Sequence, residues 1–213
     1  MKSLFRPDSG LMIAMTQITD CIFLSLFWII GCVPVVTVGA SFAALYDAAY
    51  RGFRRGEKNS WQRFLHTYRA NWKAGILPTL IFFLICALLG HVMISVWNGA
   101  VYGRLSWGFF AGMALVAVVL LGVLSLLFPM LSRFENSLPA LLKNTLVLSL
   151  ANLPRTLALG ILNALCIALC IRLIIPLFFL PALAALIGSL LIEPIFRPYM
   201  PREEEEISEE AAQ

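Results

Sequence analysis

The chain contains 213 residues, of which 60% are hydrophobic and 13% are charged, and its formal net charge is +4. A mean hydropathy of +0.86 excludes an ordinary soluble protein. The chain is too apolar overall to present the soluble basic face of a nucleic-acid-binding protein. Its positive charge suits the anionic headgroups of a lipid bilayer instead. We therefore predict an all-α protein, a polytopic transmembrane helical bundle embedded in a lipid bilayer.

Long apolar stretches mark the predicted membrane spans. A helix of about 20 residues, rising about 1.5 Å per residue, crosses the roughly 30 Å hydrocarbon core of a bilayer. We expect spans near residues 12–32, 35–50, 74–97, 105–128, 156–171 and 174–192. These spans place residues 1–200 in a single membrane domain, followed by a tail at residues 201–213.

The second predicted span is ambiguous. Pro34 breaks the first helix, because proline lacks an amide donor and disfavours helical geometry in the residue before it. The stretch 35–50 is short for a span, so it is either a short return helix or an extension of a broken first span. The return helix gives six spans with both termini on one side, and the extension gives five spans with the N-terminus on the opposite side.

The distribution of Lys and Arg predicts the sidedness, because these residues concentrate in cytoplasmic loops. Six spans leave fourteen of the sixteen Lys and Arg residues on one side, and five spans leave twelve. We prefer six spans on this count. Both topologies place the C-terminus in the cytoplasm, on the inner side of a cell membrane, together with the basic loops at 51–73 and 133–155.

Two cytoplasmic segments have the periodicity of amphipathic helices. The aromatic face of the first contains Trp61, Phe64, Leu65, Tyr68 and Trp72, and its opposite face contains Arg63, His66, Arg69 and Lys73. Aromatic rings beside a basic face are typical of a helix that lies in the membrane interface as an anchor. The alternative is a docking helix for a cytoplasmic partner. The second segment has Leu141, Leu142, Thr145 and Leu148 on one side and Lys143 and Asn144 on the other, so we expect another helix that lies along the surface.

One ionisable residue falls within the first predicted span. Asp20 shares a helix face with Thr16 and Gln17, and a charge at that depth is costly unless it faces a bundle interior, a partner or a water path. These three residues are therefore a candidate intramembrane site for a proton or a cation. The alternative is that Asp20 lies near the membrane interface, if the span begins at Ile18 or later.

The sequence contains no catalytic signature. It lacks the motifs of serine hydrolases, zinc hydrolases and phosphate-binding loops, so we expect neither an enzyme nor a bound cofactor. The five cysteines all lie in or beside apolar runs. Their positions indicate buried thiols rather than a disulfide framework or a metal site.

The C-terminal tail is strongly acidic. It contains Glu203, Glu204, Glu205, Glu206, Glu209 and Glu210. Like charges at this density repel one another and stay solvated, so we expect a disordered cytoplasmic tail. A contact with a basic partner, or with the protein's own loop at 51–73, is the alternative.

Three segments resemble one family of bacterial membrane proteins. They are Cys32-Val33-Pro34-Val35-Val36-Thr37-Val38-Gly39 followed by Ala43-Ala44-Leu45-Tyr46, the segment at 61–73, and Phe128-Pro129-Met130-Leu131-Ser132-Arg133-Phe134-Glu135-Asn136-Ser137 followed by Leu142-Lys143-Asn144. In this order, and over nearly the whole chain, they resemble the YesL family.

The resemblance implies a function linked to sugar import. The YesL family has no established molecular activity, and its genes often stand beside those of carbohydrate ABC importers and of polysaccharide breakdown. We therefore expect an accessory or assembly partner of a carbohydrate ABC importer, in contact with the importer's subunits. A small ion-coupled secondary transporter that uses Asp20 is the alternative, and a lipid-binding scaffold is a third interpretation.

Overall fold

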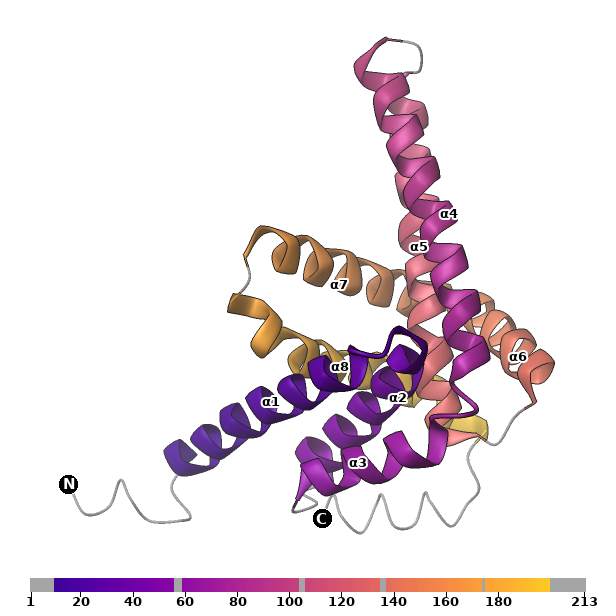
Figure 1. The fold of residues 1–213 in the computed structure, drawn as a ribbon. Coiled ribbons are helices and arrows are strands. Elements are labelled where there is room, and N and C mark those ends of the chain that lie inside the picture. The colour runs from indigo at the N-terminus through magenta and orange to yellow at the C-terminus, as the bar shows by residue number, and fades with distance from the viewer. Residues whose placement is uncertain (1–9, 56–58, 104–105, 135–136, 174, 200–213) are drawn as a thin grey trace.

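The computed structural model describes residues 10–55, 59–103, 106–134, 137–173 and 175–199, with side chains described from Gln17 onward. All regular structure in these ranges is helical, with eight α-helices, one π-helical turn, three short 3-10 turns and no strand. The helices form a bundle whose members diverge from a common base (Figure 1). The predicted all-α class is therefore confirmed.

Four helices are long and apolar enough to cross a membrane. They are α4 (Ile76–Val101), α5 (Trp107–Arg133), α7 (Leu153–Arg172) and α8 (Leu180–Phe196), the last continued by the 3-10 turn η4 (Arg197–Tyr199). A further apolar helix, α1 (Gly10–Cys32), has 23 residues. The apolar stretches therefore predicted these five helices in the right order.

The helices α4 and α5 form a long hairpin that extends away from the other helices (Figure 1). Gly103, with a φ of 70°, lies in the turn after α4, where the left-handed backbone conformation suits glycine. Near the tip, Trp97, Trp107 and Phe110 pack edge to face, with ring centroids between 5.4 and 6.1 Å apart. Aromatic rings in this position are typical of helix ends at a membrane interface.

Two glycines allow α5 and α7 to cross in close contact. Gly122 lies against the carbonyl of Thr156, and Gly160 lies against the carbonyl of Val118, so a Cβ atom at either glycine would overlap the backbone of the other helix. Small residues let the backbones of membrane helices approach closely and gain van der Waals contact. This crossing joins the α4–α5 hairpin to the hairpin of α7, η3 (Ile175–Phe178) and α8.

The base of the molecule is built around α2 (Val38–Ala49). The short turn η1 (Val35–Thr37) connects it to α1, the π-helical turn η2 (Tyr50–Arg54) continues it, and α3 (Ser60–Asn71) packs alongside. The alanines of α2 are small enough for α1 and α3 to approach closely. Eleven of the twelve residues of α2 are buried as a result.

The predicted span at 35–50 corresponds to η1 and α2. A helix of 12 residues rises about 18 Å, which is well short of the roughly 30 Å hydrocarbon core. Because α2 is buried, it is surrounded by other parts of the protein. The number of crossings, six or five, stays a prediction.

The second predicted amphipathic segment is α6 (Leu138–Ala151). Its inward face buries Leu141, Thr145 and Leu148, while Lys143 and Asn144 are exposed on the other side. The Thr145 hydroxyl donates to the Leu141 carbonyl at 2.7 Å, which satisfies that polar group inside the protein. The predicted helix and its two faces are confirmed, and its place on a membrane surface stays a prediction.

Candidate functional site

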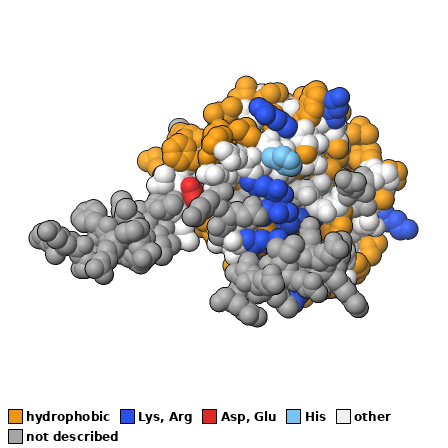
Figure 2. Space-filling view, turned by 90° about the horizontal axis from the view of Figure 1, so that it is seen from below, with side chains coloured by type: hydrophobic (Ala, Val, Ile, Leu, Met, Phe, Trp, Pro, Cys, Tyr) orange, Lys and Arg blue, Asp and Glu red, His pale blue; other side chains and the backbone are white. Residues whose placement is uncertain are grey.

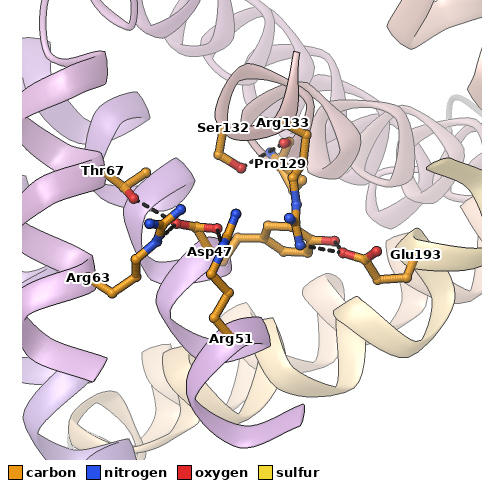
Figure 3. Close-up of polar contacts among 9 residues, drawn as sticks. Asp47, Arg51, Arg63, Thr67, Pro129, Ser132, Arg133 and Glu193 are labelled. Atoms are coloured by element: carbon orange, nitrogen blue, oxygen red, sulfur yellow. Dashed lines mark hydrogen bonds and ion pairs between the residues drawn. The ribbon is translucent and has the colours of Figure 1, made fainter. Parts of the chain in front are cut away.

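A buried carboxylate on α2 organises the base. Asp47 is 1% exposed, and its two oxygens accept three hydrogen bonds (Figure 3). Arg51 Nε donates to Oδ1 at 3.0 Å, whereas Arg63 Nε at 2.6 Å and Thr67 Oγ1 at 2.7 Å donate to Oδ2. Because Arg63 and Thr67 belong to α3, their hydrogen bonds to Asp47 hold α3 against α2. We call these contacts the clamp.

The surroundings of Asp47 keep it ionised. Burial acts to raise the pKa of this carboxyl, but the hydrogen bonds from Thr67 and Arg63 and the charges of Arg51 and Arg63 outweigh burial and hold the pKa below its ordinary value. A buried carboxylate with this set of donors is a fixed charge at neutral pH. It is therefore a poor candidate for a group that takes up and releases protons.

A second ion pair lies beside the first and joins α5 to α8. Arg133 Nη2 donates to Glu193 Oε1 at 2.9 Å, and the Tyr46 hydroxyl donates to the same oxygen at 2.8 Å. Burial and the neighbouring Glu193 carboxylate hold the pKa of Tyr46 well above its ordinary value, so the hydroxyl keeps its proton. Since Tyr46 and Asp47 are adjacent on α2, the two polar groups form one continuous assembly of α2, α3, α5 and α8.

Arginines also surround the ring of Tyr50. The guanidinium carbons of Arg133, Arg55 and Arg54 lie 4.4, 5.2 and 5.7 Å from the ring centroid, within the range of cation–π attraction. The π-helical turn η2 contains Tyr50 and Arg54 and ends just before Arg55, so this irregular turn positions three of the four groups. Viewed from below, Lys and Arg side chains gather in the middle of this face of the molecule (Figure 2).

An apolar cavity of about 380 Å³ lies above the base, between α1, α2, α5, α7 and α8. Its few polar groups include Ser125 and Asn163, where Asn163 Nδ2 donates to Ser125 Oγ at 2.9 Å. Trp28 Nε1, also in the lining, is buried and has no hydrogen-bond partner among the residues that the structure describes. The cavity is thus suited to apolar groups, and its lining does not resemble a hydrated route for ions.

The structure describes only part of the predicted intramembrane site, which therefore stays a prediction. Gln17 is exposed and Asp20 is half-buried, and the side chain of Thr16 lies outside the described residues. Asp20 makes no hydrogen bond or ion pair with any side chain that the structure describes. Among all the residues that the structure describes, no cluster of three or more His, Cys, Asp or Glu residues could hold a metal ion. The described cysteines are unpaired and half-buried.

The amphipathic helix predicted at 61–73 is α3, but its faces differ from the prediction at two residues. Phe64 is 2% exposed and contacts Phe27 of α1, so it packs against the protein core rather than facing a membrane. Arg63, predicted on the open basic face, turns inward to Asp47. Arg63 turns inward because Asp47 accepts its hydrogen bond, whereas Phe64 is buried in an apolar cluster with Leu24 of α1 and Leu45 of α2.

The remaining residues of α3 form its outer face. Trp61 and Trp72 are 46% and 45% exposed, and His66 and Arg69 are exposed as well, while Tyr68 is half-buried against the ring of Phe64. A shallow open groove runs along this side, lined by Trp61, Leu65, His66 and Arg69 among others. Two tryptophans and two basic side chains therefore face outward on α3, whose inner side is bound to Asp47 of α2.

The central groups of the base were missed at the level of sequence. Asp47 stands four residues before Arg51 in an otherwise apolar stretch, and this spacing was a readable signal of a helical ion pair. The pairing of Arg133 with Glu193, 60 residues apart, left no comparable local pattern. Only the tertiary structure brings those two side chains together.

These observations define the class of protein: a polytopic membrane protein, all-helical in its described residues, with a buried, arginine-rich ionic assembly at one end. Residues 21–91 match the model of a family described as a protein of unknown function, DUF624. The matched segment contains Asp47, Arg51, Arg63 and Thr67, so the clamp between α2 and α3 lies inside it. Neither the search of curated proteins nor that of solved structures found a match.

Proposed function

We propose that this protein is a membrane-embedded accessory or assembly partner of a carbohydrate ABC importer, and that it docks through the outer face of α3. The observation that carries the proposal is the clamp on α3. Asp47 holds Arg63 and Thr67 from the inner side, which leaves Trp61, Trp72 and the nearby basic groups in a fixed arrangement. Rigid aromatic and arginine side chains are the groups that most often dominate protein interfaces.

The choice of a sugar importer as the partner is supported by resemblance. The segments that resemble the YesL family include the one at 61–73, and the match to DUF624 covers the same helix. An ion-coupled transporter has less support in the geometry. The buried carboxylates Asp47 and Glu193 are both bound to arginines, and the cavity above them is mainly apolar. A coupling ion needs a carboxylate that can exchange partners along a hydrated route.

The orientation that we propose puts the base in the cytoplasm of a bacterial cell. Arg51, Arg54, Arg55, Arg63 and Arg133 all belong to the base, as the positive-inside tendency requires of a cytoplasmic face. The C-terminus follows α8, whose Glu193 is bound at the base, so the C-terminus is also cytoplasmic.

The docking face is tested by site-specific photo-crosslinking in native membranes of cells grown on complex plant polysaccharide. A photoreactive amino acid in place of Trp61 or Arg69 is expected to crosslink to permease or ATPase subunits of a sugar importer, identified by mass spectrometry. The same amino acid in place of Leu84, which is 62% exposed on α4, is the matched control. Crosslinks to lipid alone from both α3 positions would mean that α3 is a membrane anchor and not a docking helix.

We also propose the five-span topology, which the course of α1 supports. Ser25 of α1 accepts a hydrogen bond from the amide of Ala182 at the start of α8, whereas Gly31, near the end of α1, lies against Tyr68 of α3 at the base. Hence α1 runs from the turn between α7 and α8 to the base, and we propose that its N-terminus lies outside the cell.

A single introduced cysteine distinguishes the two topologies. In a variant without the native cysteines, Ser3→Cys is expected to react with a membrane-impermeant maleimide in intact cells whose outer barriers admit the reagent. Gln213→Cys in the same background is expected to react only after the membrane is opened. Protection of both positions in intact cells would support six spans.

A further inference from the structure

The base contains arginine donors without partners. Arg133 has a side chain that is 3% exposed, and only its Nη2 is hydrogen-bonded, whereas Nε and Nη1 are buried and have no partner among the described residues. Arg55 Nε is likewise buried and unpartnered. Buried charged donors are costly to leave unpaired, so these groups point to an anion that the described residues do not supply.

The charge balance of the base points the same way. The two ion-paired groups and the arginines at the Tyr50 ring together contain five guanidinium groups, from Arg51, Arg54, Arg55, Arg63 and Arg133, and two carboxylates, from Asp47 and Glu193. Both carboxylates are already engaged in ion pairs. Five positive charges against two negative charges leave an excess of three within this set of side chains.

We propose that the acidic C-terminal tail of the same chain binds the arginine cluster of Arg54, Arg55 and Arg133. The tail offers Glu203–Glu206, followed by Glu209 and Glu210, and carboxylates are the natural acceptors for guanidinium donors. The contact would cover the base of the protein with its own tail.

The tail begins close enough to reach the cluster. The last described residue, Tyr199, is six positions after Glu193, which is itself bound to Arg133. Glu203 to Glu206 follow four to seven residues later, and a chain of that length spans up to about 13 to 25 Å. A tethered segment of this kind acts at an effective concentration on the order of millimolar, so weak individual contacts suffice.

The test uses the full-length protein in nanodiscs of phosphatidylcholine and a glutamate-specific protease, with cleavage after Glu209 and Glu210 followed by mass spectrometry. The Arg54→Gln, Arg55→Gln double variant is expected to be cut at least tenfold faster than the natural protein. The Arg69→Gln, Arg155→Gln double variant removes the same charge from exposed positions elsewhere and is expected to stay within twofold. Replacing Glu203–Glu206 with glutamine should accelerate the same cleavage without altering any arginine.

Two results would overturn the proposal. One is equal cleavage rates for the natural protein and for both the Arg54→Gln, Arg55→Gln and the glutamine-tail variants, which would show that the tail is not held. The other is an equal acceleration in the Arg69→Gln, Arg155→Gln variant, which would show that the tail responds to overall positive charge and does not bind the cluster of Arg54, Arg55 and Arg133. Because the purified protein contains no importer subunit, either result is independent of the docking function proposed for α3.

Discussion

The Asp47→Asn variant is expected to lose about 2 to 3 kcal/mol of unfolding free energy. Removing one partner of a buried ion pair typically costs about 3 to 5 kcal/mol, because the other charge is left uncompensated. Here the Arg51 and Arg63 side chains are 20% and 31% exposed, and water takes up part of that loss. The measurement is denaturant unfolding in mild detergent, followed by circular dichroism.

The matched control is Asp20→Asn, which removes the same charge from α1. Asp20 is half-buried, without a described ion pair, so a change within about 0.5 kcal/mol is expected. Hydrogen exchange adds a local readout, since the Asp47 variant should expose the amides of α3 before those of α5. Similar losses in the two variants would show that Asp47 does not hold α3 in the way we describe.

The stabilisation by Asp47 should be lost at acidic pH and should not change near neutral pH. A carboxyl whose pKa is lowered on folding contributes stability above its unfolded pKa, ordinarily 3.8, and loses that contribution as the pH falls through the lower folded value. The difference between the natural protein and Asp47→Asn is therefore expected to be constant from about pH 5 to 8, and to shrink below about pH 4. A difference that shrinks near neutral pH would contradict the ionised assignment.

The second large effect is expected at the crossing of α5 and α7. The Gly122→Ala variant places a methyl group where the Thr156 carbonyl already lies, and a backbone atom has little freedom to move. Overpacking of this kind costs about 1 to 3 kcal/mol, and more where the backbone must shift. The expected result is a loss of at least about 2 kcal/mol and a lower thermal midpoint in detergent.

The same helix supplies the control for this prediction. Gly112, also on α5, has open space at the position of a Cβ atom. Gly112→Ala is therefore expected to be neutral or to stabilise the helix by up to about 1 kcal/mol, through the better helix propensity of alanine. If Gly122→Ala changed the unfolding free energy no more than Gly112→Ala does, the described close contact between α5 and α7 would be contradicted.

Much of the helical framework was predictable from sequence because it depends on local patterns. Long apolar runs identified α1, α4, α5, α7 and α8, since the length of a run and its lack of charge are sufficient to indicate a membrane helix. Helical periodicity identified α3 and α6 for the same reason. Pro34 correctly marked the end of α1, which stops at Cys32.

The candidate site was much less predictable. Periodicity placed Phe64 on the aromatic face of α3, but it could not show whether that face meets lipid or protein. The carboxylate of Asp47 meets partners 16 and 20 residues further along the chain, and no pattern within a helix turn encodes such a meeting. By contrast, Asp20 was predicted to belong to an intramembrane site because it lies within an apolar run, yet it has no described ion-pair partner.

By itself, the sequence determined that this is a helical membrane protein with basic, amphipathic segments and an acidic tail. Only the tertiary structure decided that α2 is buried inside the base and that Asp47 and Glu193 are held by arginines from other helices. It alone also shows that Arg133 and Arg55 have donors without partners among the described residues. The physical reason is that apolar burial depends on the composition of each segment. The pairing of buried charges depends instead on which segments meet, because hydrogen bonds and close ion pairs act over only a few ångströms.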